Sequence, residues 1–323
     1  MSVGLFSWGA ETTGDYHERS RVMGSIQIAN SLGTVLVLLV PTAIEWLADA
    51  EDLGTERVRA MGCLILALLP LTVLFSWIYG PESKVMEGKK RKQAPLWAAL
   101  KHALAQKPLR MLLVADLAIG INLGIGTSVS VFFVEIVLGL EGRIGTVQLA
   151  SLLAGLAGIP LWVLLARVLE KHRALAATAF ISVLGGFFAL LVPPNQFLLY
   201  FLASITLGVG LGGIQFLPRS IMADVLDGDR LDSGEERAGL YYSFLTSTLK
   251  IGLAIGIAAS FYVAGYFEFD PADALASTDA HYVIRYLTGW SSVALGLVII
   301  VMSWRFPIGR QQQEAMQSAI IGN

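Results

Sequence analysis

The chain has 323 residues, of which 55% are apolar and 15% are charged, and its formal net charge is -2. Soluble domains carry about 25% charged residues, so there is too little charge here to cover a water-facing surface. The composition excludes a disordered chain, and the balanced charge excludes a nucleic-acid binder. The single cysteine, Cys63, excludes an internal disulfide and a multi-cysteine metal site. A polytopic membrane protein remains.

Eight apolar stretches are long enough to cross a bilayer, since a membrane helix needs about 20 mostly apolar residues. Long apolar runs without alternation favour helices over strands, and a helix satisfies its own backbone hydrogen bonds in lipid. The predicted spans are Val22–Leu47, Ala60–Tyr79, Met111–Leu140, Val147–Leu169, Ala174–Val192, Phe197–Met222, Leu240–Phe267 and Ile284–Trp304. We therefore predict an all-α polytopic membrane bundle with eight full spans, preceded by a short apolar stub within Met1–Ala10.

Charged residues are dense beside the first span, in the sequence GAETTGDYHERSR. They are Glu11, Asp15, Glu18, Arg19 and Arg21. Two interpretations stay open, a solvated loop and a cytoplasmic gate of salt bridges. Of the 23 lysines and arginines, the loops on the opposite side of the membrane hold only Arg57, Arg59, Arg143 and Arg285. The positive-inside rule therefore predicts that both termini are cytoplasmic.

The longest interruption, Gly80–Arg110, carries the basic run GKKRK and a short amphipathic segment, Leu96–Ala105. The basic run is typical of a membrane anchor that touches anionic lipid, and the amphipathic segment is expected to lie along the inner surface. The predicted division is an N-terminal helical part (1–79), a cytoplasmic loop (80–110), a C-terminal helical part (111–305) and a cytoplasmic tail (306–323).

A second dense polar stretch runs from Pro218 to Lys250. One span is predicted to end at Asp224 and Asp227, an acidic loop follows, and Arg237 precedes the next span. Lys250 lies near the middle of that next span. Because a lysine inside a membrane is unfavourable unless it is paired or faces water, we expect it to face a polar central cavity.

A structural ion pair is the alternative role for Lys250, and Asp116 is the best candidate for its partner within the chain. Other polar residues inside spans include Gln27 and Asn122. Amides in spans either contact a ligand or form hydrogen bonds between helices. Glycines four residues apart, at Gly120 and Gly124, Gly208 and Gly212, and Gly252 and Gly256, predict close helix approach.

Enzyme chemistry has little support in the sequence. The four histidines fall in predicted loops or at the predicted surface, far apart in the chain, and no HExxH, GxSxG or P-loop motif occurs. We therefore expect neither catalytic activity, nor a resident metal, nor an organic cofactor.

The segments GAETTGDYHERSR and MADVLDGDRLDSGEERAGLYYSFLTSTLK resemble the glycoside–pentoside–hexuronide:cation symporters, the melibiose-permease group of the major facilitator superfamily. The resemblance extends from about Phe6 to Arg310 and includes FFVEIVLG at Phe132–Gly139. It implies that the eight spans are helices five to twelve of a twelve-helix fold whose halves rock around a midplane site. The first three helices and most of the fourth, which carry the family's acidic cation ligands, have no counterpart in the chain.

By this resemblance, Lys250 matches a polar lysine of helix eleven, and Gln27 occupies a fifth-helix position where sugar permeases often carry arginine. The implied function is alternating-access symport of a sugar or similar small polar solute with Na⁺ or H⁺. The residues expected along the path are Lys250, Gln27, Asp116 and Asn122, and the expected cytoplasmic gate is formed by Asp15, Glu18, Arg19, Arg21, Asp224, Asp227 and Arg237. The expected location is the inner membrane of a bacterium.

Two alternatives stay open. In the first, the chain is a truncated, non-transporting fragment of such a symporter, which a separately encoded N-terminal half could complement. In the second, the chain carries a lipid-like substrate on the same fold.

Overall fold

The computed structural model describes residues 32–37, 39–40, 42–43, 53–79, 101, 103–233, 237–267, 269, 278–309 and 312. Every regular element within these residues is helical, and seven helices are long and apolar enough to cross a membrane. The predicted all-α membrane bundle is therefore confirmed. The predicted stub at Met1–Ala10 lies outside the described residues, as does most of the predicted span Val22–Leu47.

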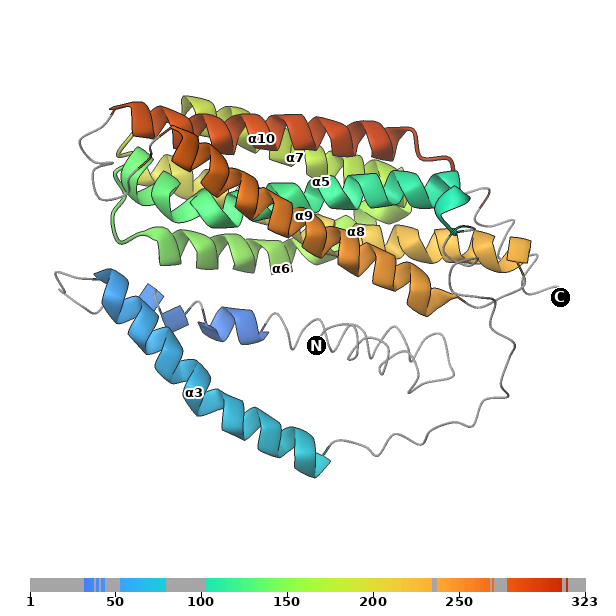
Figure 1. Ribbon diagram of the computed structural model, residues 1–323, viewed down its shortest axis with the longest axis horizontal. Coiled ribbons are helices and arrows are strands. Elements are labelled where there is room, and N and C mark those ends of the chain that lie inside the picture. The colour runs from blue at the N-terminus through green and yellow to red at the C-terminus, as the bar shows by residue number, and fades with distance from the viewer. Residues whose placement is uncertain are drawn as a thin grey trace. The chain divides into compact units, whose positions relative to one another are not determined.

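The chain forms two compact units, residues 1–96 and 97–323. In the first unit, helix α3 covers Leu53–Tyr79 and contains Pro70. In the second unit, helix α5 continues directly into a short π-helix, η1. The elements of this unit are α5 (Lys107–Phe132), η1 (Phe133–Val137), α6 (Ile144–Leu169), α7 (Lys171–Leu191), α8 (Phe197–Ser233), α9 (Ala238–Tyr266) and α10 (Thr278–Trp304). Figure 1 shows these helices as an elongated bundle that α9 crosses obliquely.

Helix α8 is much longer than predicted. Its 37 residues extend past Met222 to Ser233, which corresponds to about 55 Å at 1.5 Å per residue, well beyond the hydrocarbon thickness. The prediction that a loop follows Asp224 and Asp227 is therefore wrong. Asp224 and Asp229 are buried in the bundle and have polar partners, so the helix stays packed where the sequence suggests a solvated loop.

The helices of the second unit pack in a pattern that repeats. The main contacts join α5 to α9, α6 to α8 and α7 to α10, and the next join α5 to α10 and α7 to α8. If α5, α6 and α7 are exchanged with α8, α9 and α10 in order, this set of contacts maps onto itself. The unit is therefore built as two equivalent three-helix repeats, an arrangement known from secondary transporters.

Glycines bring the backbones of the main helix pairs together. A Cβ atom on Gly120 or Gly124 would overlap the carbonyl oxygen of Leu249 or Leu253 on α9. On α9, Gly252 and Gly256 face α5 in the same way, and Gly208 and Gly212 of α8 face α6. The close approach predicted for these three glycine pairs is confirmed, and it is the small-residue packing that membrane helices use in place of a hydrophobic driving force.

The glycine contacts predict that added methyl groups destabilise the bundle only where the helices meet. Gly124→Ala should lower the free energy of unfolding by about 1–3 kcal/mol, the usual effect of overpacking. Gly126 on the same helix has nothing within 4 Å of its Cβ position, so Gly126→Ala is the matched control. Thermal unfolding of both variants in detergent measures the difference. Equal melting temperatures would contradict the proposed backbone contact.

Candidate functional site

Lys250 lies near the middle of α9, on the exposed surface of the second unit. In the described part of the chain it makes no hydrogen bond or ion pair. Helix α9 packs on α5 through Gly252 and Gly256, and Lys250 is on a different side of the helix from these glycines. The second unit thus presents a positive charge at the middle of a membrane span without burying it in its own core.

Asp116 is buried inside the same unit, with 3% of its surface exposed. It precedes Gly120 by one turn of α5, and the opposite charge that acts on it is that of Arg219 of α8, although no ion pair joins the two. Among the described residues, Asp116 and Lys250 form no ion pair either. Asp116 is buried inside the unit, whereas Lys250 is on the exposed side of α9.

Arg219 is a site residue that the sequence analysis did not select. Its Nη1 donates a hydrogen bond of 2.6 Å to the carbonyl of Gln215, and its own carbonyl accepts a 3.4 Å bond from the Tyr242 hydroxyl. Arg219 lies within the predicted span Phe197–Met222, next to Pro218 and near the end of that span. The signal that could have selected it is a charged side chain inside a predicted span.

Asn122 forms a hydrogen bond between helices. Its Oδ1 accepts a 3.2 Å bond from Ser292 of α10, and the residue is half-buried. This contact is the structural role that amides in spans often have. A role for Asn122 in a solute path stays a prediction. Gln27 lies outside the described residues.

Ionic contacts gather at one end of the bundle, which we call the basic end because the predicted cytoplasmic loops lie there. Lys171 at the start of α7 binds Asp224 of α8 at 2.6 Å, and it also reaches the carbonyl of Ser220. Asp227 is close enough to Asp224 for their charges to interact. This pair joins α7 to α8.

Asp229 is the centre of a second polar cluster at the basic end, and it is only 1% exposed. Its Oδ1 accepts a 2.8 Å hydrogen bond from Gln106, and Arg237 approaches it to 3.8 Å. The hydroxyl of Tyr241 faces the same carboxylate. The cluster joins the residue before α5, the end of α8 and the start of α9.

The predicted gate residues Asp224, Asp227 and Arg237 therefore lie at one end of the unit, but each has neighbours within that unit. Asp229 was missed because the sequence placed it in a loop. The other predicted gate residues, Asp15, Glu18, Arg19 and Arg21, lie outside the described residues. The gate itself stays a prediction.

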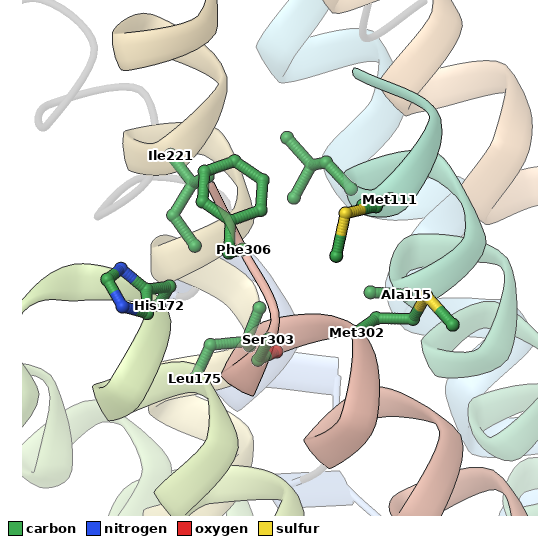
Figure 2. A pocket seen from close by; sticks show the side chains of 9 residues that line it. Met111, Ala115, His172, Leu175, Ile221, Met302, Ser303 and Phe306 are labelled. Atoms are coloured by element: carbon green, nitrogen blue, oxygen red, sulfur yellow. The ribbon is translucent and has the colours of Figure 1, made fainter. Parts of the chain in front are cut away.

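One histidine differs from expectation. His172, predicted at the surface, is buried at the start of α7, 3.3 Å from Glu170 and against the ring of Phe306. Figure 2 shows His172, Ser303 and Phe306 around a small cavity. Its volume of about 10 Å³ holds no more than one water molecule, so it has no room for a solute. Among the described residues, no group of three or more potential ligands could hold a metal ion.

A family model described as "MFS/sugar transport protein" matches residues 1–310. The chain belongs to this family. The membership agrees with the predicted resemblance to melibiose-permease-like symporters, and the described residues form the all-helical membrane bundle expected for this family.

Individual relatives of the chain are named as symporters or as transporters of lipid-like molecules. An uncharacterized symporter of Synechocystis sp. is 31% identical over 166 residues, which is 50% of this chain and 30% of that protein. A sphingosine-1-phosphate transporter of Xenopus tropicalis is 20% identical over 316 residues, 97% of this chain and 60% of its own length. A sodium-dependent lysophosphatidylcholine symporter of Danio rerio is 20% identical over 256 residues, 77% of this chain and 48% of its own length. The chain thus spans less than two thirds of the length of each.

The part-buried pair of Lys171 and Asp224 at the basic end predicts a difference between single and double substitutions. Lys171→Met leaves the Asp224 carboxylate without its partner and should lower the free energy of unfolding by about 1–3 kcal/mol. Lys171→Met/Asp224→Leu should recover most of this loss, because a buried ion pair is often replaceable by apolar residues. Melting temperatures in detergent measure the effects.

Arg173→Met is the matched control for this prediction, since Arg173 starts the same helix but has 58% of its side chain exposed. Exposed ion pairs contribute little, so this variant should melt close to the parent. A double variant less stable than Lys171→Met would overturn the interpretation.

Proposed function

We propose that this protein acts in secondary active transport, moving a small polar, sugar-like solute together with Na⁺ or H⁺ by alternating access. Membership of the transporter family and similarity to a symporter support transport. The sugar-like solute and the coupling cation are inferences from the resemblance in the motifs around Asp224 and Lys250. We infer no enzymatic role.

The observation that carries this proposal is the position of Lys250. A charged side chain near the bilayer centre is strongly unfavourable against lipid, yet Lys250 is exposed on the second unit, and none of the described residues pairs with it. We propose that a polar cavity lies on this side of α9 and removes the unfavourable contact. A hydrated solute or cation can then meet the ammonium group at mid-membrane.

The packing of the second unit fits a body that moves as a whole. Glycine contacts hold α5 to α9 and α6 to α8, and ionic contacts hold the basic end. In alternating access one half of the transporter rocks against the other. We place the basic end and both termini in the cytoplasm of a bacterium, where Asp224, Asp227 and Arg237 are candidates for the inner gate.

A lipid-like substrate is the second candidate, and a crevice away from Lys250 favours it. A cavity of about 200 Å³ lies between α5, α9 and α10, and Phe132, Phe261, Ala264 and Phe269 make much of its lining. Two of the relatives are named for lipid substrates. A crevice lined mainly by apolar side chains suits an acyl chain better than a sugar.

Transport should depend on the charge of Lys250. Lys250→Ala should reduce coupled uptake into proteoliposomes about tenfold or more, the effect of losing one charge-assisted contact, while Lys107→Ala at the exposed start of α5 should not. Uptake of a panel of labelled sugars under a Na⁺ or H⁺ gradient measures this. Unchanged uptake by Lys250→Ala would remove Lys250 from the path.

A variant that fills the crevice with a larger side chain distinguishes a lipid-like substrate from a sugar. Gly265 lines it and has nothing within 4 Å of its Cβ position, so Gly265→Val adds volume there without overlap. If the substrate is lipid-like, this variant should lose several-fold in uptake of a labelled lysophospholipid. Gly239→Val, also in open space on α9, is the control. A sugar carrier should tolerate both variants equally.

A further inference from the structure

Asp116 differs from the other buried carboxylates of the second unit. Asp224 is bound by Lys171 at 2.6 Å, and Oδ1 of Asp229 accepts a hydrogen bond from Gln106. Oδ2 of Asp116 and Oδ2 of Asp229 are both buried without a hydrogen-bond partner among the described residues. Asp116 differs because its other oxygen is not hydrogen-bonded there either. Only 3% of the surface of Asp116 is exposed.

Among the elements that pack against α5, one contributes a charged residue at about the same depth along the bundle as Asp116. On α8 this neighbour is Arg219. On α9 the ionisable groups nearest its level are Tyr242, whose hydroxyl bonds the Arg219 backbone, and Lys250, which points to the exposed side. The central part of α10 carries no charged side chain, and Glu135 of η1 is at the far end of α5.

Asp116 and Arg219 are near each other but not joined. No ion pair within 4.0 Å connects them in the described residues, and the Arg219 guanidinium instead donates to the carbonyl of Gln215 on its own helix. A buried carboxylate without partners is costly when ionised and tolerable when protonated. Ionised, it would need the guanidinium to turn toward it.

Two arrangements of this pair are therefore available. With a proton on Oδ2, Asp116 is neutral, which fits the observed hydrogen bond of Arg219 to the Gln215 carbonyl. When the proton leaves to water, the carboxylate attracts the guanidinium and draws α8 toward α5. Because α5 belongs to one three-helix repeat and α8 to the other, this change acts at the contact between the repeats.

We propose that Asp116 is a proton-binding site of this transporter, protonated in the present arrangement and bound to Arg219 when it ionises. The proton adds to one carboxylate oxygen and returns to water, and no other bond forms or breaks. The role of the bound proton in driving a solute rests on the proposed transport function. Proton binding itself is measurable without transport.

The test is infrared difference spectroscopy of the full chain in liposomes, recorded between acidic and alkaline buffer. The parent should show the carbonyl band of a protonated, buried carboxylic acid that disappears as the buffer becomes alkaline. Asp116→Asn should lack this band, while Glu135→Gln, which removes a carboxylate from the far end of the same span, should keep it. An unchanged band in Asp116→Asn would overturn the proposal.

Arg219→Gln tests the partner. Without the guanidinium, the ionised carboxylate loses its counter-charge, so the midpoint of the band's titration should move to higher pH by about one unit or more. Asp116→Glu should restore a titrating band and guards against misfolding of the asparagine variant. A midpoint unaffected by Arg219→Gln would show that the two residues are not coupled.

Transport measurements separate this inference from the proposed function. A titrating band that depends on Asp116, in a protein that moves no tested solute, would support the proton site and contradict the transport proposal as framed. Solute accumulation that is equal in the parent and Asp116→Asn at every pH, together with an unchanged band, would leave transport standing and remove the proton site.

Discussion

Close contact between helix backbones is the constraint on which the second unit depends. Where Gly120 and Gly124 meet α9, and where Gly208 and Gly212 meet α6, a single methyl group would collide with a carbonyl oxygen. Lipid provides no hydrophobic drive for helices to associate, so dense packing has to hold them. The main helix pairs of the three-helix repeats are held by these contacts, and the glycines of α8 approach both α6 and α7.

The charged residues of this unit differ between the basic end of the bundle and its middle. At the basic end, where α8 continues past the apolar region, Asp224 and Asp229 are buried and partnered. Closer to the middle, two ionisable groups lack such partners in the described residues: Asp116 inside the bundle and Lys250 on its exposed side. Ionisable groups in unfavourable surroundings are common at functional sites, and these two residues carry the functional proposals.

Much of the fold could be read from the sequence, because apolar runs of membrane length have few alternatives to helix. The end of α8 was mispredicted because its surroundings are not visible in the sequence. The acidic run after Met222 looks like a solvated loop when the sequence is considered alone. Its burial depends on Lys171 and Gln106, which belong to other parts of the chain. His172 was misplaced in the same way, since Phe306 covers it from the far end of the chain.

The sequence by itself determined the membrane class, the family and the choice of Lys250, because hydropathy, loop charge and local motifs are properties of short segments. The tertiary structure decided which charges meet. It brought Asp116 under the influence of the Arg219 charge without an ion pair, brought Arg237 to 3.8 Å from Asp229, and left Lys250 on the exposed side of α9. These neighbours come from separate segments of the chain, and their approach depends on how the helices pack through their glycines rather than on any local pattern.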